Sequence, residues 1–127
     1  MQAEPQKGLS VASFHTILYC QKWAECVSFY RDVLQLPVVF ENEVFLEFGP
    51  APGARLGLID AKRSRRAQVQ ARSLVLSFRV PDLREAHQFL RTRHPGVSSL
   101  KDHPWGARLF EMEDPEGRRI EFWTESS

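Results

Sequence analysis

The sequence is poor in cysteine, which excludes two classes of small protein. Only Cys20 and Cys26 are present among 127 residues. Two cysteines cannot form a framework of several disulfides, and the chain has no C-x-x-C pair or Cys/His spacing of the kind that binds zinc. We interpret the two residues as reduced, partly buried thiols.

The sequence also lacks an excess of charge of either sign. Its 17 Lys and Arg residues nearly balance its 16 Asp and Glu residues, for a formal net charge of +1. This balance gives no global field to attract nucleic acid or an anionic bilayer. Apolar runs are far shorter than the roughly 20 residues that span a membrane, and residues 1–10 contain no hydrophobic export segment. We therefore expect a cytoplasmic protein with no nucleic-acid or membrane partner.

Several common catalytic motifs are missing as well. The chain contains no G-x-G-x-x-G, no Walker A loop, no G-x-S-x-G elbow and no H-E-x-x-H helix. These motifs respectively cradle dinucleotides, hold nucleotide phosphates, present a serine nucleophile and bind catalytic zinc. Function must therefore be sought in the fold and in scattered residues.

What is present is a composition typical of one globular domain. Hydrophobic residues make up 43% and charged residues 26% of the chain, and this length can bury a core without disulfides or metal. Residues 1–10 are polar and are expected to be a loose N-terminal leader. Residues 62–72 are basic and poor in apolar groups, which favours a solvated linker, with a phosphate or nucleic-acid contact as the alternative.

The order of expected elements repeats once along the chain. Alternating and apolar stretches predict strands at 13–20, 38–41, 44–48 and 55–60, with an amphipathic helix over 24–34. The second half repeats this order with strands at 74–80, 97–100, 107–113 and 118–124 and a helix that begins at the capping box of Asp82 and Glu85. The Asp114-Pro115-Glu116-Gly117 turn joins the last two strands. A shift of 60 residues superposes the halves, so the sequence predicts an α+β fold of tandem βαβββ modules at 11–61 and 73–125, within one domain at 11–125.

Three segments carry a resemblance to a known family. They are Phe29-Tyr30-Arg31-Asp32-Val33-Leu34-Gln35-Leu36-Pro37, then Pro104-Trp105-Gly106, and finally Asp114-Pro115-Glu116-Gly117-Arg118-Arg119-Ile120-Glu121-Phe122. In order and spacing they resemble the vicinal oxygen chelate superfamily, which includes glyoxalase I, extradiol dioxygenases and bleomycin-resistance proteins. The resemblance covers residues 11–125. It implies a curled mixed sheet around a cavity shared by the two modules, and it implies a homodimer.

The resemblance also implies four positions at which metal-dependent members bind a divalent ion. They fall on His15, Gly57, Val75 and Glu121. His15 and Glu121 can ligate a metal, whereas Gly57 and Val75 cannot, and two protein ligands hold a metal only weakly. We therefore expect no bound cofactor, although substrate oxygens or Asp60 could restore a divalent metal site. The alternatives for the two candidates are a hydrogen-bonded core histidine and an outward strand carboxylate.

Five further residues are expected to line the cavity: Tyr19, Trp105, Arg108, Phe110 and Trp123. Aromatic rings with one basic group suit a planar or anionic organic molecule, although each ring could instead pack in the core. We expect a small-molecule-binding protein in which His15 and Glu121 transfer protons or anchor a polar group. The alternatives are a divalent-metal-dependent lyase or dioxygenase of the same superfamily, and a non-catalytic interface or regulatory module.

Overall fold

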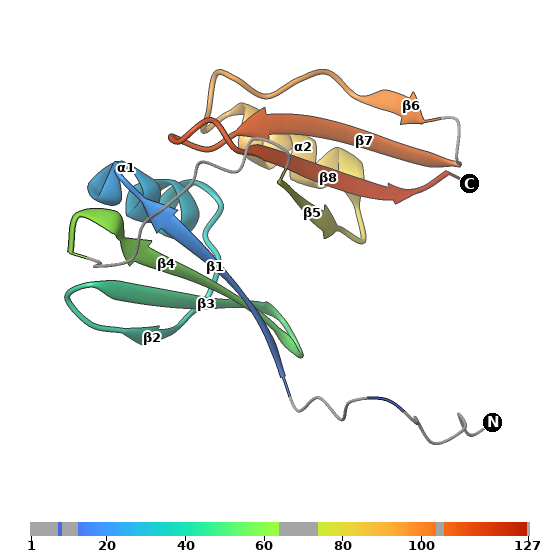
Figure 1. The fold of residues 1–127 in the computed structure, drawn as a ribbon. Helices are drawn as coiled ribbons and strands as arrows, with labels where there is room; N and C mark the ends of the chain where they lie inside the picture. Colours follow the sequence, from blue (N-terminus) through green and yellow to red (C-terminus); the bar gives the residue numbers. More distant parts are fainter. Residues whose placement is uncertain (1–7, 9–12, 64–73, 104–105, 127) are drawn as a thin grey trace.

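A computed structural model describes residue 8 and residues 13–63, 74–103 and 106–126 (Figure 1). Most of the predicted leader at 1–10, most of the predicted linker at 62–72, and Trp105 lie outside the described residues. Each helix within the described ranges is too short or too polar to cross a lipid bilayer.

The first half folds into one four-stranded sheet with a helix. Its elements are β1 (Phe14–Cys20), α1 (Trp23–Ser28), the π-helical segment η1 (Phe29–Val33), β2 (Val38–Glu41), β3 (Phe45–Ala51) and β4 (Ala54–Asp60). The strand order is β1-β4-β3-β2, with β1 parallel to β4 and the other pairs antiparallel. The β2–β3 hairpin therefore lies on the side of β4 that faces away from β1, with β2 at the edge of the sheet.

The second half repeats this topology. After the short helix η2 (Ala61–Arg63) come β5 (Val75–Arg79), α2 (Leu83–Arg91), β6 (Lys101–His103), β7 (Ala107–Glu113) and β8 (Arg119–Glu125). The strand order is β5-β8-β7-β6, and again the first and last strands of the module, β5 and β8, are parallel neighbours. The predicted tandem βαβββ fold is confirmed, as two four-stranded sheets that are not closed into a barrel.

Local signals account for most element boundaries. Asp82 caps α2, since its Oδ1 accepts a hydrogen bond from the Glu85 backbone N–H at 3.0 Å, which satisfies one of the free donors of the first helical turn. Gly117 ends the β7–β8 turn at φ +86°, a left-handed conformation that favours glycine. One strand is misplaced in the prediction: residues 97–100 are irregular, and β6 begins at Lys101.

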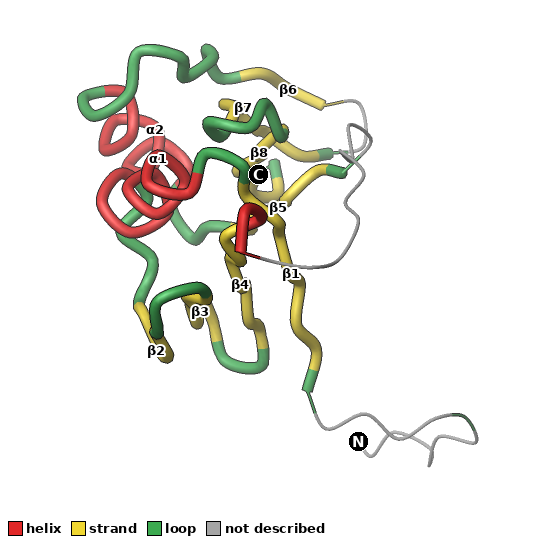
Figure 2. The backbone as a smooth tube through the Cα atoms, turned by 60° about the vertical axis from the view of Figure 1, so that its left-hand side comes forward, coloured by secondary structure: helices red, strands yellow, loops and turns green. Residues whose placement is uncertain are grey.

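The helices α1 and α2 lie on the same side of the strands (Figure 2). The core lies between these helices and the two sheets. Side chains alternate along each strand, so every second strand residue faces the helices. The buried residues on this face include Leu18, Cys20, Leu46, Phe48, Leu56, Leu58, Phe110, Met112, Ile120 and Phe122. The two cysteines are both buried and free.

A buried polar cluster joins the halves, and we call Tyr30, Asp114 and Arg118 the junction cluster. The Tyr30 hydroxyl donates to Asp114 Oδ2 at 2.7 Å, and Arg118 Nη1 donates to the same oxygen at 2.9 Å. Arg118 Nη2 also donates to the Tyr19 carbonyl of β1. Burial, and then the charge and hydrogen bond of Asp114, raise the pKa of Tyr30 well above its usual value, so the phenol remains a donor. The cluster fixes the turn after β7 against the end of β1.

Candidate functional site

The strand faces that point away from the helices carry the candidate site, and we call them the open faces. On β1 the alternation places His15, Ile17 and Tyr19 opposite the buried Leu18 and Cys20. The parallel register sets Arg55 beside His15 and Gly57 beside Ile17. His15 and Ile17 are exposed, and these positions belong to the open face of the first sheet.

His15 is held by two hydrogen bonds. Its Nδ1 lies 2.8 Å from Glu47 Oε2 on β3, and its Nε2 lies 2.9 Å from the Ser13 hydroxyl oxygen. The Glu47 carboxylate can only accept, so Nδ1 carries a proton, and in the neutral imidazole Nε2 then accepts from the Ser13 hydroxyl. Neither Ser13 nor Glu47 was predicted from the sequence as a site residue. Glu47 stands between the buried Leu46 and Phe48, and this alternation is the signal that could have found it.

Glu121 lies on the open face of the second sheet. Its Oε2 accepts a hydrogen bond from the Ser77 hydroxyl of β5 at 2.6 Å, and its neighbour on β7 is Glu111. Two residues further along β8 and on the same face is Trp123, with the Arg79 guanidinium 6.0 Å from its ring. His15 and Glu121 therefore lie on different sheets, and each has a partner from its own sheet.

The residues at the four family positions do not fit a bound divalent ion. Gly57 has no side chain, and a Cβ there would lie 2.7 Å from a Phe45 ring carbon and 2.9 Å from Ile17 Cδ1. A ligating side chain at this position would have to displace both residues. Val75 offers no donor atom. Within the described ranges, no three His, Cys, Asp or Glu side chains are grouped so that they could hold a metal ion.

The structure separates the other predicted ligand-binding residues. Arg108 and Phe110 lie on the helix-facing side of β7, opposite to Glu121, because Phe110 is in register with the buried Phe122. Phe110 is fully buried, and its ring centroid lies 4.9 Å from that of His87 of α2. The Nε atom of Arg108 lies 2.9 Å from Asp102 Oδ1. Neither residue shares a face with His15 or Glu121, which corrects the expected cavity wall.

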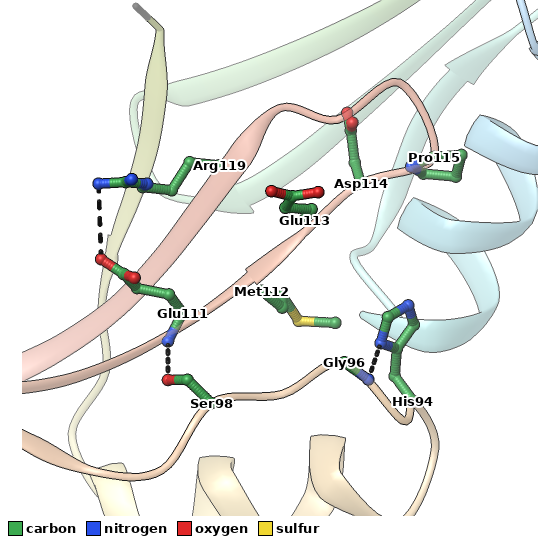
Figure 3. Close-up of a pocket in the computed structure, with 9 residues that line it drawn as sticks. All are labelled: His94, Gly96, Ser98, Glu111, Met112, Glu113, Asp114, Pro115 and Arg119. Atoms are coloured by element: carbon green, nitrogen blue, oxygen red, sulfur yellow. Dashed lines mark hydrogen bonds and ion pairs between the residues drawn. The ribbon is translucent and has the colours of Figure 1, made fainter. Parts of the chain in front are cut away.

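A separate cavity of about 490 Å³ opens between the segment after α2 and the end of β7 (Figure 3). Its polar groups are partly paired with one another. The Glu111 backbone N–H donates to Ser98 Oγ at 2.9 Å, and the Glu111 carboxylate lies 3.7 Å from Arg119 Nη1. His15 and Glu121 are not among its lining residues. Glu111 and Arg119 also belong to the open face of the second sheet, so the cavity borders that face without including His15 or Glu121.

Comparisons with known proteins identify the family. Residues 13–122 match the family model of the Glyoxalase/Bleomycin resistance protein/Dioxygenase superfamily. A glyoxalase/bleomycin resistance protein/dioxygenase from Nocardioides has a similar structure, with a TM-score of 0.75, 21% identity and coverage of 96% of this chain and 87% of that chain. The lactoylglutathione lyase from Agrobacterium tumefaciens has a TM-score of 0.72 and 22% identity, covering 94% and 95% of the two chains.

A third similar structure is TioX from Micromonospora sp. ML1, with a TM-score of 0.73, 15% identity and coverage of 91% and 99%. Comparison with curated proteins gives no match. At these identities the structural likeness shows the fold, and the family model covers most of the chain. The chain therefore belongs to the Glyoxalase/Bleomycin resistance protein/Dioxygenase superfamily.

Proposed function

We propose that this protein binds a planar aromatic small molecule on its open faces without a resident metal ion. Members of the superfamily often bind small molecules and often use divalent metals. Binding without metal is supported by what occupies the four positions at which metal-dependent members of the family hold an ion. Gly57 is covered by Phe45 and Ile17, while His15 and Glu121 are each hydrogen-bonded to a neighbour.

The open faces offer the two kinds of contact that such a ligand needs. Tyr19, Phe45 and Trp123 are partly buried, so each leaves ring surface for stacking. The carboxylates of Glu47 and Glu121 are acceptors and favour a ligand with O–H or N–H donors. Arg108 lies on the other side of its sheet, and the open-face Arg79 and Arg119 are paired with Glu125 and Glu111, so an anionic ligand group has less support. An aromatic ligand with donor groups is the better fit.

Calorimetric titration with a panel of phenols, aromatic amines and benzoates tests this proposal. We expect phenols or aromatic amines to bind and Trp123→Ala to weaken the binding at least tenfold, or about 1.4 kcal/mol, because the ring supplies a stacking surface. The matched control is Trp23→Ala, since Trp23 belongs to α1 and lines a different cavity. Equal affinity of the two variants, or binding of benzoates alone, would contradict the proposal.

Two alternatives give different results in the same study. For a metal-dependent lyase or dioxygenase, metal analysis of protein purified without chelator should find about one divalent ion per chain. We expect far less than one, because Gly57 and Val75 supply no ligand atom. For an interface or regulatory module, no compound of the panel should bind.

We further propose a homodimer, as is common in the superfamily. Val38, Val39 and Phe40 leave large apolar side chains 40–51% exposed along β2, which is the edge strand of the first sheet. A second copy of the chain would cover such a surface. Sedimentation equilibrium should give twice the chain mass of 14.7 kDa, and the single-chain mass would contradict this part of the proposal.

A further inference from the structure

We propose that Ser13, His15 and Glu47 form a nucleophile–base–carboxylate relay that lets this protein transfer acyl groups from activated esters to water. This activity goes beyond ligand binding and does not depend on it. Two distances carry the inference: 2.9 Å from Ser13 Oγ to His15 Nε2, and 2.8 Å from His15 Nδ1 to Glu47 Oε2. These are the hydrogen bonds by which a serine nucleophile is recognised, whatever the fold.

The sheet explains how the three side chains meet. Ser13 and His15 are two residues apart at the start of β1, so both lie on its open face. Glu47 belongs to β3, and β4 lies between β1 and β3. Strands two positions apart are separated by about 9.6 Å, so His15 and Glu47 meet above β4. The β4 residue in register with Glu47 is Gly57, and Phe45 and Ile17 of the two flanking strands pack over it.

The exposure of the relay suits a nucleophile that must reach its substrate. Ser13 is exposed, and the His15 side chain is 41% exposed. Ile17 follows His15 on the same face and offers apolar contact to a short acyl chain or an aromatic leaving group. Arg55 is in register with His15 on the same face, but its Nη1 donates to the Ala54 carbonyl at 2.8 Å, so no oxyanion role is assigned to it.

The proposed acyl transfer needs only the ester, water and the three side chains, and no cofactor. As Ser13 Oγ bonds to the ester carbonyl carbon, its proton passes to His15 Nε2 and the carbonyl oxygen becomes an oxyanion. The bond to the leaving oxygen then breaks, and His15 returns the proton to that oxygen. Water, deprotonated by His15, hydrolyses the acyl-Ser13 ester, so the sum is ester plus water to acid plus alcohol. Glu47 keeps the proton on Nδ1 and stabilises the imidazolium in both steps.

p-Nitrophenyl acetate is the probe, with absorbance for release of p-nitrophenolate and peptide mass spectrometry for the acyl-enzyme. The wild-type chain should show an initial burst and carry one acetyl group on Ser13 after acid quench. Ser13→Ala should lower the rate about 10²-fold, the lower end of the effect of general base catalysis. Glu47→Gln should lower the rate about tenfold, because an amide does not select the required tautomer as a carboxylate does.

Two controls separate the relay from ordinary imidazole chemistry. His94→Ala removes a histidine outside the relay and should leave the rate unchanged. Ser13→Ala should keep the wild-type melting temperature, since the side chain it removes is exposed. An unchanged rate in Ser13→Ala, or acetyl groups found only on histidine or lysine, would overturn the relay. The calorimetric titrations report ligand binding separately, so the relay and the proposed binding function can fail independently.

Discussion

Replacing Asp114 with alanine is expected to lower the free energy of unfolding by about 3–5 kcal/mol, the usual cost of removing one partner of a buried ion pair. The Asp114 side chain is fully buried and accepts from Tyr30, from the Arg118 guanidinium and from the backbone N–H groups of Glu116 and Arg118. The variant leaves the Arg118 cation, whose side chain is 12% exposed, without its counter-charge. The loss should also loosen the contact between the halves, because Arg118 bridges the β7–β8 turn and the Tyr19 carbonyl.

Asp102→Ala is the matched control for this prediction. Asp102 also forms a 2.9 Å pair with an arginine, but its side chain is 79% exposed, and exposed pairs contribute about 0–1 kcal/mol. Urea unfolding followed by circular dichroism measures both variants. Similar small losses for Asp102→Ala and Asp114→Ala would show that the junction cluster contributes little, and would contradict the assigned role of Asp114.

The sequence predicted the fold because its local signals agree with its repeat. The N-cap at Asp82, the glycine at 117 and the alternation in β1, β7 and β8 all indicate the same topology, and the 60-residue shift places both halves in it. The second helix was predicted from its cap and apolar stripe and is confirmed at Leu83–Arg91. The misplaced strand at 97–100 has weaker support, because its alternation is weak and a turn signal, Pro95-Gly96, bounds it on one side only.

The face of β7 on which Phe110 lies depends on the register of a single hairpin. A two-residue loop would pair Asp114 with Gly117 and would set Phe110 against Glu121. The chain instead forms a three-residue loop, in which the Asp114 backbone N–H donates to the Arg118 carbonyl at 2.9 Å. Phe110 then pairs with Phe122, on the opposite face from Glu121. A shift of one residue moves every side chain to the other face, so correct elements can still give a wrong site.

The relay partners of His15 were missed for a different reason. Glu47 lies 32 residues away on β3, and its contact with His15 depends on the strand order, which places β4 between β1 and β3. Gly57 was predicted only as a family metal position that has no ligand atom. The structure shows Phe45 and Ile17 of the two flanking strands packed over it, so the strand order, and no local pattern, brings His15 and Glu47 together.

Phe110→Ala and Trp123→Ala are expected to separate stability from binding. Phe110 is fully buried between His87 and Phe122, with ring centroids 4.9 and 5.0 Å away. Its truncation should lower the free energy of unfolding by about 3–5 kcal/mol through lost apolar contact and the cavity that remains. Ligand affinity per folded molecule should stay near the wild-type value, because the ring does not reach an open face.

Trp123→Ala should give the reverse pattern. Its ring is only partly buried, and its one ion contact is with the exposed Arg79, a pairing worth about 0.5–1 kcal/mol. We therefore expect a smaller loss of stability than for Phe110→Ala, with at least a tenfold loss of affinity for the phenols or aromatic amines that bind. Urea unfolding and calorimetry on the same two preparations provide both quantities. A Phe110→Ala protein that stays stable but no longer binds would place the ligand on the helix-facing side of the second sheet, and the open faces would lose their assigned role.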